Sequence, residues 1–168
     1  AAHNQGIVHR DLKPDNVMLG VGDEGFLKLL DFGVAKNLTQ QGADMTTVSG
    51  ALLGTPAYMA PEQIRHSSHV DARADIYAVG VMLYEALTGQ RPFAGNAIEL
   101  LSKQLFESVV PPSEVAKQRH IERPHINWPA MDRIVLRALA KEPEERYPEV
   151  GEFLRELQDA WPRVVLPE

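Results

Sequence analysis

The sequence has 168 residues, a formal net charge of −6, 44% hydrophobic and 24% charged residues, and no cysteine. This length is sufficient for one domain with a hydrophobic core, and the composition is that of an ordinary globular protein. The negative charge argues against a nucleic-acid binder, which usually presents a basic face. The lack of cysteine excludes a disulfide framework and a thiolate metal site. The longest apolar run, residues 76–84, is too short to cross a bilayer.

The chain opens with a polar loop between two short predicted elements. Residues 1–8 look like the frayed end of a helix that Gly6 closes as a left-handed cap. Residues 9–16 are predicted to form a loop, because Pro14 disfavours helix at the residue before it and two turn formers follow. Residues 17–19 and 26–30 are typical of two strands joined by a turn. This hairpin would place Asn16 and Asp31 at its two open ends, close enough to share a cation.

The middle of the chain changes from loop to helix. Residues 34–53 lack periodicity and are too polar to build a core, and a loop of this length is usually functional or disordered. Residues 54–62 return to structure through turns. Residues 71–87 form the strongest predicted helix, which is apolar on both faces and should therefore be the buried spine of the domain.

The remainder of the chain is predicted to form three more helices. Residues 96–106 carry apolar side chains at helical spacing. Residues 110–128 are rich in proline and charge, and we expect them to form an irregular surface excursion. Pro129 starts a helix that ends before Pro143, and Pro148 starts a final one that ends at Trp161. The predicted fold is therefore mainly α, a helical bundle with one small β-hairpin that carries the polar loops.

The polar loop at residues 9–16 contains the side chains that phosphoryl transfer requires. An aspartate such as Asp11 can orient a hydroxyl and accept its proton. The ammonium of Lys13 can stabilise negative charge on a moving phosphoryl group, and Asn16 and Asp31 offer the hard oxygen ligands that Mg²⁺ prefers. Each of these residues alone would more simply be a solvated turn residue, so it is their combination and spacing that indicates a site.

These motifs resemble the C-terminal lobe of the catalytic domain in eukaryotic-type Ser/Thr protein kinases, of the sort also found in bacteria. The matching segments are HRDLKPDN at 9–16, DFG at 31–33, GTPAYMAPE at 54–62, DARADIYAVGVMLYEALTGQRPF at 71–93 and AKEPEERY at 140–147. The resemblance covers residues 1–161 and leaves 162–168 as a tail. It implies the α+β protein-kinase fold, represented here by its large C-terminal lobe.

The resemblance implies a role for each matching residue of the loops. Asp11 would be the catalytic base and Lys13 the contact to the γ-phosphate of ATP. Asn16 and Asp31 would be the ligands of Mg²⁺ or Mn²⁺, and Asp15 would be a further residue of the ATP-binding site.

Four further residues gain roles from the same resemblance. Thr55 would belong to the catalytic set, and with Lys13 it favours serine or threonine over tyrosine as the acceptor. Glu62 would pair with Arg146, and Asp75 would hold the backbone of the catalytic loop. Without the resemblance, the Glu62 and Arg146 pair would be interpreted as two surface charges that contribute little.

The resemblance also suggests how the enzyme would be regulated. Arg10 would pair with a phosphorylated activation loop, and Lys36 could help to order that loop around the added charge. We expect the modified residue to be Thr47, with Ser49 or Thr46. The alternative is that these are ordinary polar loop residues.

We expect a partner lobe that this chain does not contain. Gly20-Val21-Gly22 is interpreted only as the turn of the hairpin and not as part of a Gly-rich loop of the form G-x-G-x-x-G. The resemblance also includes neither a VAIK-type lysine nor its partner glutamate. The chain also begins at Ala1 rather than Met. An N-terminal lobe that grips ATP is therefore expected to be missing, and the chain alone should be a poor enzyme.

The implied activity is transfer of the γ-phosphoryl group of Mg²⁺-ATP to protein Ser or Thr residues, with a kinase dimer for autophosphorylation. We expect a cytoplasmic location, with any membrane anchor outside this chain. One alternative is a non-catalytic binding module of pseudokinase type. Another is a small-molecule phosphotransferase, which the GTPAYMAPE segment disfavours because it resembles a platform for protein substrates.

Overall fold

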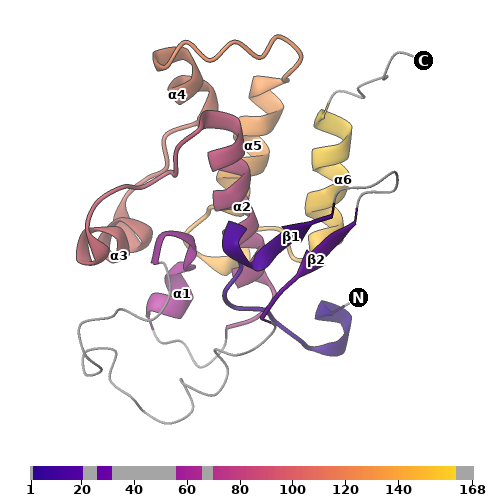
Figure 1. Ribbon diagram of the computed structural model, residues 1–168. Coiled ribbons are helices and arrows are strands. Elements are labelled where there is room, and N and C mark those ends of the chain that lie inside the picture. Colours follow the sequence, from indigo (N-terminus) through magenta and orange to yellow (C-terminus); the bar gives the residue numbers. More distant parts are fainter. Residues whose placement is uncertain (1, 21–25, 32–55, 66–69, 162–168) are drawn as a thin grey trace.

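The computed structural model describes residues 2–20, 26–31, 56–65 and 70–161. Within these residues the chain forms a helical mass with one two-stranded antiparallel sheet (Figure 1). The elements in chain order are η1 His3–Gln5, η2 Pro14–Asn16, β1 Val17–Leu19, β2 Leu27–Leu29, η4 Pro56–Tyr58, α1 Pro61–Ile64, α2 Arg73–Thr88, α3 Ala97–Phe106, α4 Pro112–Gln118, α5 Trp128–Ala138, η5 Pro143–Glu145 and α6 Val150–Ala160. The prediction of a mainly helical lobe with a small hairpin is confirmed.

Helix α2 is the centre of the hydrophobic core, as its apolar sequence predicts. Ile76, Tyr77 and Val81 are at most 1% exposed, and helices α4, α5 and α6 all pack against α2. The helix ends at Gly89, which adopts the left-handed conformation (φ 71°) and donates its N–H to the carbonyl of Glu85. This is the usual way in which a glycine terminates a helix.

The close crossing of α2 and α5 depends on Gly80. A Cβ atom at this position would lie 2.9 Å from the Cβ of Ala138 and 3.2 Å from Cδ2 of Leu139. Both are fully buried or nearly so. The absence of a side chain at residue 80 therefore sets how closely the two helices approach.

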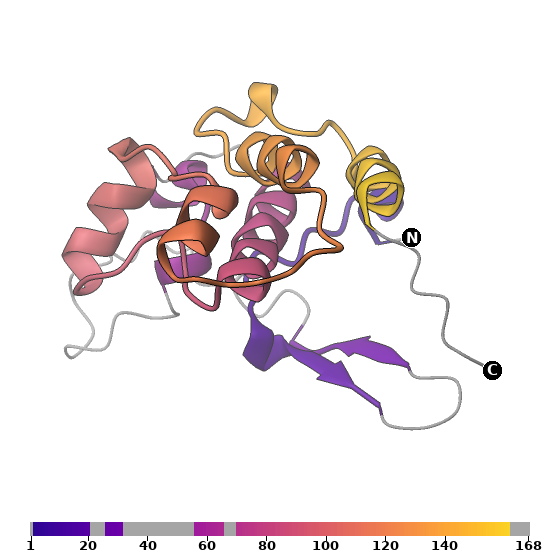
Figure 2. The ribbon, with the colours of Figure 1, turned by 90° about the horizontal axis from the view of Figure 1, so that it is seen from above.

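The hairpin extends away from the helices, as Figure 2 shows. Val17 lies opposite Leu29 and Leu19 opposite Leu27. Beyond the last strand pair, the N–H of Leu30 donates to the carbonyl of Asn16 at 2.9 Å. The hairpin therefore brings the residue before β1, Asn16, close to the residues that follow β2.

Several parts of the chain differ from the sequence-based prediction. Helix α1 forms at Pro61–Ile64, where the sequence predicts turns up to residue 62, and α6 begins at Val150 rather than at Pro148. Residues 112–118 form helix α4 rather than an irregular excursion, and Val115 and Ala116 are buried in the core. The proline pair that indicates a break instead places Pro112 at the first helical position, where its missing N–H costs nothing. At the N-terminus the frayed helix is one 3₁₀ turn, residues 3–5, closed by left-handed Gly6 as expected.

We expect Gly80→Ala to lower the free energy of unfolding by about 1–2 kcal/mol, because overpacking of the α2–α5 contact outweighs the better helix propensity of alanine. Urea unfolding monitored by circular dichroism measures the change. Gly151→Ala is the matched control. A Cβ there would meet nothing closer than 3.5 Å, so that variant should be neutral or slightly more stable. Equal effects at the two positions would contradict the close crossing.

Candidate active site

The backbone of the loop at residues 9–16 is held by one buried carboxylate. The N–H groups of His9 and Arg10 donate to Oδ2 and Oδ1 of Asp75, both at 2.9 Å. Nε2 of His3 lies 2.8 Å from the same Oδ2. Asp75 is only 4% exposed and belongs to the first turn of α2. The peptide that leads into Asp11 is therefore fixed to the centre of the core.

Arg10 has a positive φ of 66°, which is uncommon for a residue with a side chain. Its N–H is bound by Asp75, and its carbonyl accepts the side-chain amide of Gln63 at 2.8 Å. Its guanidinium donates to the carbonyl of Val70 at 3.3 Å. These contacts compensate for the unfavourable backbone conformation and turn the chain sharply immediately before Asp11.

The structure brings Asp11, Lys13 and Asn16 together. Nζ of Lys13 lies 3.2 Å from Oδ2 of Asp11. Nδ2 of Asn16 donates to the carbonyl of Asp11 at 2.7 Å and to its Oδ2 at 3.1 Å. The Asp11 side chain is 40% exposed, whereas that of Lys13 is 18% exposed. The carboxylate is thus oriented from two sides and still open to an incoming hydroxyl group.

The candidate metal ligands lie at the open ends of the hairpin. Asn16 is buried and precedes β1, and Asp31 is exposed and follows β2 with a left-handed φ of 57°. Because Nδ2 of Asn16 faces Asp11, its Oδ1 is the atom left to bind a cation. An amide oxygen and a carboxylate are a donor set that suits Mg²⁺. In the part of the chain that the structure describes, no three histidine, cysteine or acidic side chains cluster as a metal site.

The end of β2 is joined to the loop at a second point. The carbonyl of Leu30 lies 2.8 Å from Nε2 of His9, and the N–H of Leu30 donates to the carbonyl of Asn16. Asp31 follows directly. Asp15 lies exposed in the η2 turn beside Asn16.

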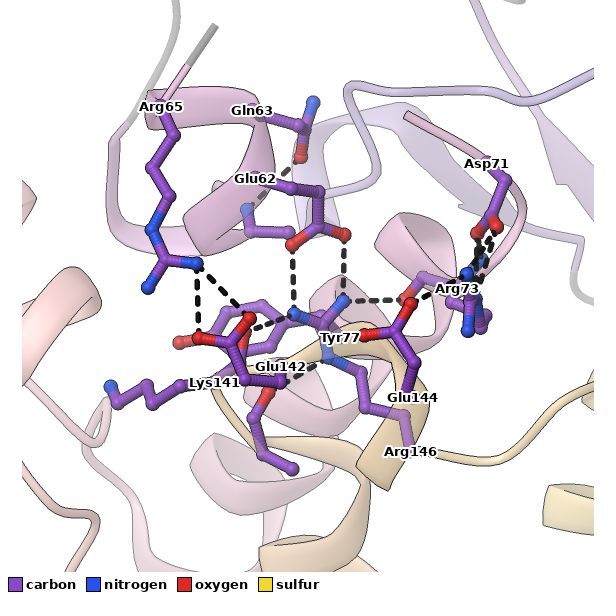
Figure 3. Close-up of polar contacts among 12 residues, drawn as sticks. Glu62, Gln63, Arg65, Asp71, Arg73, Tyr77, Lys141, Glu142, Glu144 and Arg146 are labelled. Carbon is purple, nitrogen blue, oxygen red and sulfur yellow. Dashed lines mark hydrogen bonds and ion pairs between the residues drawn. The ribbon is translucent and has the colours of Figure 1, made fainter. Parts of the chain in front are cut away.

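Glu62 and Arg146 form a buried ion pair, shown in Figure 3. Nη1 and Nη2 of Arg146 donate to the two carboxylate oxygens at 2.7 and 2.8 Å. The other three N–H groups of Arg146 donate to the carbonyls of Arg73, Ala140 and Lys141. All five donors of the guanidinium are therefore satisfied, and the interpretation of the pair as two surface charges is wrong.

Comparison with known proteins identifies the family. The model of the protein kinase domain matches residues 1–157. The chain belongs to the protein kinase family. It is 43% identical over 162 residues to the serine/threonine-protein kinase pkn3 of Myxococcus xanthus, covering 94% of this chain and 28% of that protein. It is 46% identical over 164 residues to Pkn1 of the same organism (95% and 22%), and 40% identical over 157 residues to PknB of Mycolicibacterium smegmatis (93% and 23%).

These relatives confirm the resemblance to Ser/Thr protein kinases. The kinase chain spans about a quarter of the length of the curated relatives it matches. No helix in the residues that the structure describes is long and apolar enough to cross a membrane.

Several predicted site residues of the kinase lie outside the described residues. These are Lys36, Thr46, Thr47, Ser49 and Thr55. Their roles stay predictions. The expectation that the chain has no motif of the form G-x-G-x-x-G is wrong, because glycines 20, 22 and 25 have this spacing. Residues 21–25 lie outside the described residues, so the interpretation of this segment as a simple turn stays a prediction.

Sequence reasoning missed Gln63, which connects two parts of the site. Its Oε1 accepts the N–H of Ala60 at 3.0 Å, and its Nε2 donates to the carbonyl of Arg10. Tyr58 was also missed. It donates its hydroxyl to Oε2 of Glu85 at 2.7 Å, and burial, together with this hydrogen bond, raises the pKa of Tyr58. Neither contact has a local sequence signal, because the partners are 27 and 53 residues away.

Lys141 binds the carboxyl end of α3 from within the lobe. Its Nζ donates to the carbonyls of Lys103 and Gln104 at 3.2 and 2.8 Å and lies over the ring of Phe93. Burial lowers the pKa of Lys141 from 10.5 to about 8, although the charge of Glu107 opposes this shift. The kinase lobe thus contains a lysine that titrates near the upper end of the physiological range.

Removing one partner of the buried ion pair should strongly destabilise the lobe. We expect Glu62→Ala to lower the free energy of unfolding by about 3–5 kcal/mol, because Arg146 is then left as an uncompensated buried charge. Urea unfolding is the measurement. The matched control is Glu142→Ala, which removes an exposed pair with Arg65 and should cost less than about 1 kcal/mol. Similar losses for the two variants would contradict the assignment of the buried pair.

Lys141 should make the stability of the lobe depend on pH. Between about pH 8 and pH 10.5 the unfolded chain retains the Lys141 proton and the folded chain does not. Because the unfolded state then binds more protons, this residue raises stability as pH increases through that window. We expect the difference in unfolding free energy, wild type minus Lys141→Met, to increase between pH 7.5 and pH 9.5. A constant difference across this range would contradict the lowered pKa.

Proposed function

We propose that this kinase chain supplies the catalytic loop for transfer of the γ-phosphoryl group of Mg²⁺-ATP to Ser or Thr hydroxyl groups of proteins. The observation that carries the proposal is the arrangement around Asp11. Its carboxylate contacts Lys13 and Asn16, and the backbone before it is bound by Asp75. A base whose position is fixed before the substrate arrives needs no reorganisation during the reaction.

In the proposed reaction, Asp11 orients the acceptor hydroxyl and takes its proton as the oxygen bonds to the γ-phosphorus. The bond between the γ-phosphorus and the bridging oxygen breaks, and ADP leaves with that electron pair. Lys13 stabilises the negative charge that spreads over the phosphoryl oxygens. Oδ1 of Asn16 and the carboxylate of Asp31 would hold Mg²⁺, which neutralises phosphate charge when it is bound.

We infer that the grip on ATP comes from an N-terminal lobe of the same protein. The kinase chain covers about a quarter of its relatives, and its hairpin presents large apolar side chains to solvent. Leu19 is 71% exposed, and Phe26 and Leu27 are each 62% exposed. A contiguous apolar surface of this kind is typical of an interaction site.

We also propose that the enzyme is activated by phosphorylation of Thr47, with Ser49 or Thr46, by a second copy of the kinase. Phosphate adds roughly −1.5 to −2 charge, which Arg10 and Lys36 would neutralise. Arg10 is half-buried, and its guanidinium contacts only a backbone carbonyl among the described groups. The guanidinium could therefore rotate toward a phosphate without breaking an ion pair among the residues that the structure describes.

The test compares the intact masses of three proteins after incubation with Mg²⁺-ATP and a basic protein substrate. They are this chain, the chain extended upstream to include the small lobe, and the extended chain with Asp11→Asn. We expect only the extended wild type to transfer phosphate efficiently, and Asp11→Asn to lose at least about 100-fold in rate. Asp159→Asn, at an exposed position of α6, is the matched control and should transfer as wild type.

Other outcomes of this experiment would change the proposal. If Asp11→Asn transfers as fast as wild type, the assignment of the base is wrong. If no form transfers phosphate or binds nucleotide with Mg²⁺, a non-catalytic binding module is the better interpretation. Phosphate on an aminoglycoside but not on protein would indicate a small-molecule phosphotransferase. Mapping that finds no phosphopeptide between residues 39 and 55 of the active enzyme would refute the regulatory site.

A further inference from the structure

Helix α3 buries one polar side chain completely. Gln104 of α3 is 0% exposed and lies against α2 and the η4 turn at Pro56–Tyr58. Its Nε2 donates to the carbonyl of Ala57 at 2.7 Å and to that of Pro56 at 3.4 Å. Its Oε1 accepts the hydroxyl of Tyr77, which is also fully buried. A buried amide is costly unless it is hydrogen-bonded, and here both ends of the amide have partners.

The direction of these hydrogen bonds is fixed by chemistry. The carbonyls of Pro56 and Ala57 can only accept, so the NH₂ group of Gln104 must face them. The oxygen of the amide then faces Tyr77, whose hydroxyl must donate. Burial raises the pKa of Tyr77, which keeps this hydroxyl protonated. Only one arrangement of the three groups satisfies all of them.

The η4 turn is also connected to the proposed catalytic loop. Three residues beyond Ala57, the N–H of Ala60 donates to Oε1 of Gln63, and Nε2 of Gln63 donates to the carbonyl of Arg10. Arg10 immediately precedes Asp11. The charge of Asp15 is also close enough to Tyr58 to contribute to its raised pKa. Two sets of hydrogen bonds, joined by the backbone between Ala57 and Ala60, therefore lead from α3 to the loop that carries the proposed base.

We propose that Gln104 is a positioning residue, which fixes the 56–63 segment relative to α3 and α2 and so sets the surface on which a protein substrate meets Asp11. This inference rests on the proposed kinase function. The position of α3 itself is defined at the same residue, because the carbonyl of Gln104 accepts from Lys141. The side chain and the backbone of Gln104 thus tie α3 to two different parts of the lobe.

The test replaces Gln104 with methionine, a side chain of similar size that cannot donate to the carbonyls of Pro56 and Ala57. In the extended kinase, we expect Gln104→Met to raise the KM for the protein acceptor up to about tenfold, because binding must then order a segment that one good hydrogen bond holds in wild type. The KM for Mg²⁺-ATP should stay within about twofold, because no contact of Gln104 described here reaches Asn16 or Asp31. A smaller folded fraction would lower kcat without changing either KM, so this split separates positioning from simple destabilisation.

Hydrogen exchange gives a second readout that needs no catalysis. In this chain, amides of residues 57–63 should exchange about tenfold faster in Gln104→Met than in wild type, while those of α2 and α5 are unchanged. Gln118→Met, at an exposed position of α4, is the matched control. If Gln104→Met does not fold, Tyr77→Phe/Gln104→Met removes the hydroxyl that would be left unpaired and is compared in the same way.

The two readouts distinguish the possible failures. Unchanged acceptor KM and unchanged exchange at 57–63 would overturn the role of Gln104 and leave the kinase function intact. Faster exchange with an unchanged acceptor KM would show a tether that does not act on catalysis, which also overturns the inference. Lack of phosphate transfer by the extended wild type would instead refute the proposed function.

Discussion

The carboxylate of Asp75 is the constraint on which the loop at residues 9–16 depends. It accepts two consecutive backbone N–H groups and is nearly excluded from water. An isolated buried carboxylate would be very costly, so its hydrogen bonds to the loop are also what makes its burial tolerable. Its place in the first turn of α2 adds the favourable field of the helix N-terminus. The core and the loop before Asp11 therefore stabilise each other through this side chain.

Arg146 has a similar effect on other segments that pack near the start of α2. Its guanidinium pairs with Glu62 and also donates to the carbonyl of Arg73, at the start of the same helix. A pair of this kind need not add net stability compared with apolar residues, but here all five donors of the guanidinium have fixed partners. It fixes the short helix α1, and with it Gln63, relative to α2. Two buried charges from distant parts of the sequence thus define where the segments around the site meet.

The sequence predicts most of what depends on local patterns. The apolar run of α2, the hairpin and Gly6 as a left-handed cap are all confirmed. Helix α4 was missed because Pro112 breaks a preceding helix and starts a following one equally well, and only burial of Val115 against α5 decides between them. The roles of Asp75, Glu62 and Arg146 follow from the family resemblance and not from any local pattern. Nothing within ten residues of Asp75 shows that it binds a loop 65 residues earlier in the chain.

Gln104 shows why such contacts escape prediction from the sequence. On a helical projection it lies on the same side of α3 as Leu100, among residues whose spacing indicates an apolar face. Apolar packing alone would hold this face against the η4 turn, but it would tolerate small shifts of one element along the other. An amide that must satisfy two carbonyls and one hydroxyl does not tolerate such shifts. A shift of about 1 Å would break hydrogen bonds, and the buried groups cannot replace these with bonds to water. The proposed phosphoryl transfer would require the acceptor surface to be placed to better than that distance. A polar group at the centre of an otherwise apolar contact is therefore the physical feature that can provide such precision.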